Sequence, residues 1–284
     1  MASPGPNTAG TPKTTDYNLG RGVVYLAPIN ASGYPQGWRD LGNTLSFKSN
    51  VTIEELIHRS SRAGLKTIDK KVTVSQDIQV SFECDELNFE NFALFFSGTQ
   101  DSFTNPAVAG FSEWVMVPDG ELALGRWYDI KNSSHVRAYD ITASDVTVKT
   151  NEGSPVTLVL NTDYTIDATM GRIFIKATST AAATSISGGK GLKVTLAAKA
   201  GAVTPISRVK GLTISPATYA LKFVSENPTN ANQQTEFMFF QVTVTPDGDL
   251  EQIGDDWSKM GFKGAVEINT TLNRTLEVVR PLGT

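Results

Sequence analysis

The chain has 284 residues, of which 40% are hydrophobic and 19% are charged, and its formal net charge is −4 at pH 7. This composition is typical of one large or two ordinary folded domains and excludes an intrinsically disordered chain. The small acidic excess argues against a dedicated nucleic-acid binder. Cys84 is the single cysteine, which excludes an intramolecular disulfide and a multi-cysteine metal site.

The first segment in chain order, residues 1–20, is rich in proline, glycine and threonine. It lacks the charged-then-apolar pattern of a signal peptide, so we predict a flexible arm that orders only against a partner. No run in the chain approaches the roughly 18 apolar residues of a membrane-spanning helix, and we expect no membrane insertion.

Three strands are predicted next, at Gly22–Ala27, Trp38–Lys48 with a turn or bulge at Gly42-Asn43, and Val51–Ile57. The following segment, His58–Lys71, reads as a long loop in which five residues are Lys or Arg and one is Asp. Its lack of interleaved aromatic residues disfavours a phosphate-binding patch and favours a solvated loop or one that docks on an acidic neighbour. Its basic residues and histidine are His58, Arg59, Arg62, Lys66, Lys70 and Lys71.

The stretch Val72–Cys84 alternates strictly: every odd position is polar, and every even position except Gln76 is apolar. Successive strand side chains point to opposite faces, so the pattern predicts one long strand with a dry face and a wet face. At about 3.3 Å per residue its length is roughly 43 Å, which suits the wall of a wide barrel. Cys84 is in phase with the dry face and is predicted to be a small buried hydrophobic residue.

The segment Leu87–Phe96 changes to helical spacing. Asn88 is a candidate N-cap, Glu90 suits the positive first turn, and Gly98 stands where the helix should stop. A helix this short is unstable alone, so we expect its phenylalanine stripe to pack on the dry face of the preceding strand. The predicted core residues of this helix are Phe89, Phe92 and Phe96.

Residues 121–201 read as a separate unit of short strands divided by turns, with no convincing helix, which predicts a small β-sandwich. The Ala/Ser/Gly-rich stretch Ala181–Gly191 is predicted to be a loose loop. The expected strands are Arg126–Ile130, Asp145–Lys149, Val156–Leu160, Tyr164–Asp167, Arg172–Lys176 and Leu192–Ala197.

Strand patterns return after residue 201, in Ala217–Glu226, Glu236–Val244 and Gly264–Thr271. We therefore predict a mainly β protein with four parts: an N-terminal arm (1–20), a first part of the core (21–120), an inserted β domain (121–201), and the rest of the core with a C-terminal arm (202–284).

Catalytic motifs are missing from the sequence. Neither histidine stands in a motif with a nucleophile, and Ser187–Gly191 lacks the spacing of a phosphate-binding loop. The acidic cluster between Asp247 and Asp256 does not meet the twelve-residue pattern of a calcium loop. We expect no enzyme activity, no cofactor and no metal site.

Two groups of segments carry a resemblance to a known family. They are GRGVVYLAP, LGNTLSFKSNVTIEELIHRSS and VTVSQDIQVSFECDELNFENFALFFSG, and then ATYALKFVSENP and FMFFQVTVTPDGDLEQIGDDWSKMGFKGAVEI. Residues 20–98 and 209–272 resemble the tail tube (major tail) proteins of long-tailed bacteriophages. The resemblance lies in the order of the strands, the central helix and the turns.

The resemblance implies two packed sheets with one short flanking helix, in a sandwich or barrel core, and six subunits that close into rings stacking into a tube. It implies a hydrophilic, usually acidic lumen, here lined by Asp77, Gln79, Glu83 and Glu267, and a ring-to-ring contact through His58–Lys71. The inserted domain would be immunoglobulin-like and lie outside the tube.

The partners implied by the resemblance are other copies of the chain, the tape measure, tail-tip and terminator proteins, and double-stranded DNA that passes without specific binding. The implied location is the virion tail, and the host cytoplasm during assembly.

Two other classes remain open. One is a related ring former, such as a tail hub, a terminator or a secretion-type tube subunit. The other is a β-sandwich adhesin or carbohydrate-binding module, which predicts exposed aromatic side chains on one face. Rings or tubes seen by negative-stain microscopy would distinguish these classes.

Overall fold

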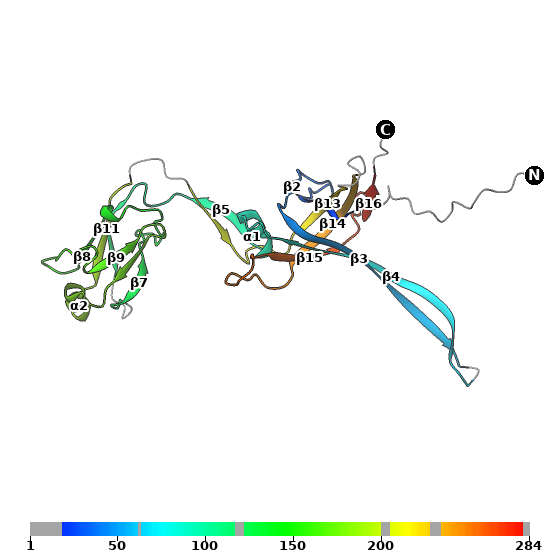
Figure 1. Ribbon diagram of the computed structural model, residues 1–284, viewed down its shortest axis with the longest axis horizontal. Helices are drawn as coiled ribbons and strands as arrows, with labels where there is room; N and C mark the ends of the chain where they lie inside the picture. The colour runs from blue at the N-terminus through cyan, green and yellow to red at the C-terminus, as the bar shows by residue number, and fades with distance from the viewer. Residues whose placement is uncertain (1–18, 62–63, 117–121, 200–204, 228–233, 281–284) are drawn as a thin grey trace, which may run out of the picture. The chain divides into compact units, whose positions relative to one another are not determined.

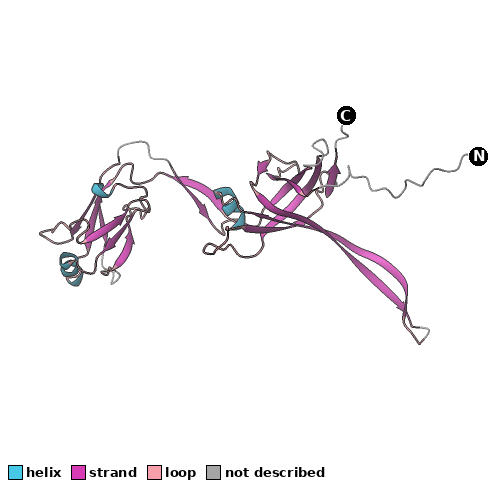
Figure 2. Ribbon diagram, in the orientation of Figure 1, coloured by secondary structure: helices cyan, strands magenta, loops and turns pink. Residues whose placement is uncertain are grey.

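The computed structural model describes residues 19–61, 64–116, 122–199, 205–227 and 234–280, which form a mainly β protein with several antiparallel sheets (Figures 1 and 2). Contacts divide it into two units: one contains the described residues up to Gln100 and from Val209 onward, and the other is Asp101–Arg208. The second unit is therefore larger than the predicted insert of residues 121–201. The two predicted borders of the insert, at residues 121 and 201, lie outside the described residues. Residues 1–18 of the predicted N-terminal arm also lie outside them.

The first unit contains one antiparallel sheet in the order β2-β1-β13-β14-β15-β4-β3, with β16 also paired to β14. Its two ends, β2 and β3, each have one side without a partner strand among the described residues. The strands are β1 (Arg21–Pro28), β2 (Arg39–Asp40), β3 (Thr44–Ser60), β4 (Thr67–Cys84), β13 (Thr218–Glu226), β14 (Thr235–Pro246), β15 (Met260–Val266) and β16 (Leu276–Val279).

This sheet curls so that its two halves enclose a core. A register shift between Tyr219 and Leu221 interrupts the β13–β14 pairing, and such a bulge bends a strand. Phe47 of β3 consequently stacks on Phe223 of β13, with ring centroids 4.9 Å apart. Gly264 of β15 allows the side chain of Val242, on the neighbouring strand β14, to pack closely. A Cβ atom at position 264 would lie only 2.4 Å from Val242 Cγ1. The fully enclosed core side chains include Val24, Leu41, Val80, Phe82, Leu221, Phe239, Met260 and Phe262.

Strands β3 and β4 form a hairpin that continues past the rest of the sheet. They pair from Thr44↔Cys84 to Ser60↔Thr67, whereas β15 pairs with β4 only over Ile78–Cys84. The prediction of a loop over His58–Lys71 is therefore wrong, because most of these residues belong to β3 and β4. Residues 58–60 pair across the hairpin with residues 67–70, and the basic composition of the segment concealed this strand pairing.

Helix α1 (Phe89–Phe95) confirms the predicted cap, because the Asn88 side chain accepts a hydrogen bond from the Asn91 backbone N–H at 2.8 Å. Its predicted core face is only partly right. Phe89 and Phe96 are exposed, Phe92 packs against the core, and Phe95 is the buried ring of the helix. A seven-residue helix has two adjacent faces with similar apolar spacing, and packing against Phe262 selects the face of Phe95.

The second unit packs two three-stranded sheets, β7-β10-β9 and β6-β11-β8, around one core. The predicted strand Val156–Leu160 forms only isolated bridges at Thr157 and Leu160. A short 3₁₀ helix, η3 (Ala143–Asp145), precedes β8. The strands are β6 (Phe111–Met116), β7 (Arg126–Asp129), β8 (Val146–Thr150), β9 (Tyr164–Asp167), β10 (Arg172–Ile175) and β11 (Leu192–Leu196). At the border between the units, β5 (Thr99–Phe103) pairs with β12 (Ile206–Lys210).

The predicted loose loop Ala181–Gly191 is wrong, because Thr180–Ser187 forms helix α2, which packs on β11 and β8. The Ser179 side chain caps its N-terminus by accepting from the Ala182 backbone N–H at 3.2 Å. Alanine has the highest helix propensity, so the cap and the alanine run together explain why the segment is helical.

Candidate functional site

The polar face predicted on β4 exists and extends over its neighbours. Asp77, Gln79 and Glu83 occupy alternate positions of β4 and are exposed. Gln79 pairs with Ala265 of β15, and directly paired residues share a face of the sheet. The same register places Glu267, one residue beyond β15, toward Asp77. The structure therefore brings these four predicted residues onto one exposed face.

This face has more mixed charge than the resemblance implied. Lys48 of β3 pairs with Ser81 of β4, and Ser81 also pairs with Lys263 of β15. Both lysines are exposed, and they offset part of the charge of the three carboxylates at Asp77, Glu83 and Glu267. The sequence reasoning missed both lysines, although each follows the same alternation as its strand.

Glu267 is held in place by two side chains of β14. Its carboxylate accepts hydrogen bonds from Gln241 Nε2 and Thr243 Oγ1, each at 2.9 Å. Lys263 Nζ lies 3.2 Å from Asp247 Oδ1 at the other end of β15. Glu54 of β3 pairs with Ser75 on the same face, where Ser75 Oγ donates a hydrogen bond to its carboxylate at 3.3 Å, so the face carries acidic, basic and neutral side chains together.

The outer half of the β3–β4 hairpin carries apolar side chains that the first unit leaves in solvent. Leu56 pairs directly with Val72, and both are exposed. The predicted dry face of β4 is buried only at Val80, Phe82 and Cys84, because β15 ends at the level of Ile78. The other exposed apolar residues of this outer half are Val51, Ile53, Ile57, Leu65, Ile68 and Val74.

A register shift also breaks the alternation of the hairpin faces. Glu54 pairs with Ser75 and Glu55 with Thr73, so Val74 has no direct partner. In such a bulge the extra residue lies unpaired and the order of the faces changes beyond it. The even positions of β4 therefore do not form one continuous face.

The predicted ring-stacking residues are distributed over the end of this hairpin. His58 and Arg59 lie on β3, Lys70 and Lys71 on β4, and Lys66 in the turn; Arg62 lies outside the described residues. Two of them have acidic partners within the chain. His58 Nδ1 lies 2.5 Å from Asp69 Oδ1, and Lys71 forms an ion pair with Glu55. The segment is thus a partly neutralised hairpin end.

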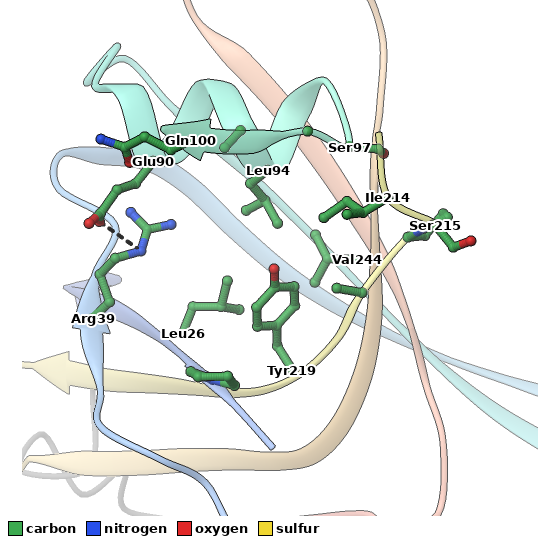
Figure 3. A pocket seen from close by; sticks show the side chains of 15 residues that line it. Leu26, Arg39, Glu90, Leu94, Ser97, Gln100, Ile214, Ser215, Tyr219 and Val244 are labelled. Atoms are coloured by element: carbon green, nitrogen blue, oxygen red, sulfur yellow. Dashed lines mark ion pairs between the residues drawn. The ribbon is translucent and has the colours of Figure 1, made fainter. Parts of the chain in front are cut away.

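A pocket of about 260 Å³ lies in the first unit between α1 and strands β1, β13 and β14 (Figure 3). Leu26, Leu94, Ile214 and Val244 provide apolar walls, and Figure 3 shows the Tyr219 hydroxyl directed between them. Burial raises the pKa of this tyrosine above its ordinary value, and the protonated hydroxyl can donate a hydrogen bond into the pocket.

One wall of the pocket is anchored by a polar network that the sequence did not indicate. Arg39 Nε lies 3.2 Å from Glu90 Oε2, and Arg39 Nη1 donates to Asn91 Oδ1 at 2.7 Å. The buried Asn91 amide donates in turn to the backbone carbonyls of Leu41 and Glu86. This network fixes α1 against the start of the sheet.

Cys84 lies beside this network, fully buried as predicted. Burial raises the pKa of its thiol from 9.0 to about 11, with Arg39 acting in the opposite direction. A thiol of this kind is unreactive at neutral pH, because the thiolate is the nucleophile.

Two other kinds of site are missing from the described residues. Within the described ranges, His, Cys, Asp and Glu side chains form no group of three that could hold a metal ion. No helix among the described residues combines the length and the apolar character needed to cross a membrane.

A comparison with family models matched residues 17–276 to a family described as protein of unknown function UCP028589. A search of curated proteins gave no match. Because the matched region includes both units and most of the chain, the protein belongs to the family described as protein of unknown function UCP028589.

Proposed function

We propose that the protein is a structural subunit that forms hexameric rings, and that these rings stack into the tail tube through which a bacteriophage ejects its DNA. The observation that carries this proposal is the β3–β4 hairpin. It extends past the sheet with exposed apolar side chains, including the directly paired Leu56 and Val72, and this arrangement suits contact with another copy.

The open sheet ends support a closed ring. Strands β2 and β3 stand at opposite ends of the sheet order. An edge strand exposes unpaired N–H and C=O groups that can pair with another chain, and closure into a ring removes such edges. When one edge of each subunit binds the other edge of the next subunit, the subunits form a ring if the rotation between neighbours returns to its starting point.

The polar sheet face supports a conduit. A lumen for DNA needs a hydrated wall without clusters of cations, which would bind phosphate groups. Here the carboxylates of Glu54, Asp77, Glu83 and Glu267 outnumber the ammonium groups of Lys48 and Lys263. Each ring would repeat this weakly acidic band around its axis.

Negative-stain electron microscopy of the purified full-length protein, over a series of concentrations, tests the proposal. We expect rings and hollow tubes. Single rings that never stack would favour a hub or terminator, and a strictly monomeric protein at high concentration would contradict both assignments.

A further inference from the structure

The exposed face of the β7-β10-β9 sheet in the second unit groups an aromatic row beside an ionic row. Trp127 of β7 pairs with Phe174 of β10, and their rings lie 5.3 Å apart at an interplanar angle of 47°. The next outward-facing residue of β10 is Arg172, whose neighbours Ile173 and Ile175 point into the core. Trp127 is 48% exposed, so about half of a large side chain faces solvent.

The ionic row is formed by Arg172 with one carboxylate on each side. Arg172 pairs across the sheet with Asp129 and Asp167, and its Nη2 donates to Asp167 Oδ2 at 2.6 Å. This hydrogen bond is the main reason that the pKa of Asp167 lies below its ordinary value, and the ionised carboxylate can accept hydrogen bonds.

The guanidinium also fixes the indole. The Cζ atom of Arg172 lies 5.2 Å from the centre of the Trp127 ring, within the range of a cation–π contact. On the other side of the row, Arg137 Nη1 and Lys131 Nζ lie 3.2 and 3.4 Å from the Asp129 carboxylate. The aromatic and charged groups therefore hold one another in place before any ligand binds.

We propose that this face is a binding site for a neutral polysaccharide. A pyranose ring has an apolar C–H face that can stack on an indole, and hydroxyl groups that need donors and acceptors at its edge. Adjacent outward-facing positions of a strand are about 7 Å apart, which places the ionic row within reach of the hydroxyl groups of a sugar stacked on Trp127. Asp129 and Asp167 offer acceptors, and Arg172 offers donors.

The area and charge of the site favour a sugar over other partners. Half of an aromatic side chain corresponds to roughly 100 Å², whereas a stable protein interface needs about 800 Å² on each side. Three cations, Lys131, Arg137 and Arg172, face the two carboxylates, so the site has little excess charge with which to attract a polyanion. This inference does not depend on the proposed tube assembly.

Affinity electrophoresis of the full-length protein in native gels tests the proposal, with soluble neutral glucan, galactan or mannan in the gel and heparin as the polyanion control. We expect one or more of the neutral polymers to retard the wild type. Trp127→Ala should weaken this retardation roughly tenfold or more, and Trp127→Phe should weaken it less. Trp257→Ala is the matched control, because Trp257 is an exposed tryptophan of the first unit.

A second measurement does not depend on how a variant folds. Oxidation of the wild-type protein with N-bromosuccinimide, followed by peptide mass spectrometry, should modify both Trp127 and Trp257. The polymer that retards the protein should protect Trp127 alone. Retardation by none of the neutral polymers, retardation by heparin only, or equal oxidation of Trp127 with and without the polymer would overturn the proposal.

Discussion

The hairpin pair Leu56↔Val72 gives the most direct test of how subunits would associate. We consider the double substitution Leu56→Gln and Val72→Thr, which removes apolar surface and retains two hydrogen-bonding strands. Leu56 is 68% exposed and Val72 47% exposed in the single chain. Their replacement should therefore change the free energy of unfolding of the monomer by no more than about 0.5 kcal/mol.

The effect on assembly should be much larger. Full burial of a leucine or valine side chain contributes about 1.5–3 kcal/mol. Scaled by the exposed fractions, burial against a neighbouring copy would contribute about 1–2 kcal/mol for Leu56 and about 0.7–1.4 kcal/mol for Val72. The sum is about 2–3 kcal/mol per contact, so the critical concentration for assembly should rise roughly 30- to 150-fold.

Light scattering over a concentration series measures this shift, and urea unfolding measures the stability of the monomer. Val159→Thr, at an exposed valine of the second unit, is the matched control and should leave the critical concentration unchanged. Equal critical concentrations for the double variant and the wild type would refute the reasoning. A loss of monomer stability above about 1 kcal/mol would show that the two side chains pack within one chain.

Four other outcomes are expected. Phe262→Ala removes a ring that stacks on Phe82 in the core and should lower the free energy of unfolding by about 3–5 kcal/mol in urea titrations; Phe89→Ala, at an exposed ring, should cost far less. Replacing residues 105–204 with a short Gly/Ser linker should leave tubes visible by microscopy, because the first unit has its own core. Between about pH 9 and pH 11 the thiol of Cys84 keeps its proton in the native state and loses it in the unfolded state. Its contribution to the free energy of unfolding should therefore fall by at most about 2.7 kcal/mol as the pH rises through this range. Urea titrations of the wild type and Cys84→Ala at each pH measure this fall as the difference between the two proteins. Asp77→Lys with Glu83→Lys should permit assembly but slow DNA ejection at low salt, and normal ejection rates there would show that this face does not line the channel.

Sequence reasoning succeeded where a feature depends on neighbouring residues. The alternation of Val72–Cys84 predicted a strand, and the side chain of Asn88 predicted the start of α1, because side-chain direction and capping are set within a few residues. It failed at Thr180–Ser187, where Ser179 and the alanine run were local signals for a helix that the surrounding glycines obscured.

The candidate site was only partly predictable. The order of strands in the sheet decided that Lys48 and Lys263 share a face with Asp77 and Glu83, and no short-range pattern contains that pairing. The Arg39–Asn91 hydrogen bond likewise joins residues 52 positions apart in the sequence. Such contacts form only when distant segments pack together, so they leave no periodic signal.

The sequence by itself determined that the protein is mainly β, that Asp77–Glu83 of β4 has one polar face, and that a distinct unit interrupts the core. The tertiary structure decided how far the dry face of β4 is covered. Alternation fixes which side chains share a face, but burial requires a partner strand, and β15 ends at the pair Val266↔Ile78. Beyond that pair the bulge at Val74 changes the order of the faces, and Val74 and Val72 are exposed because no described segment of the chain packs over them.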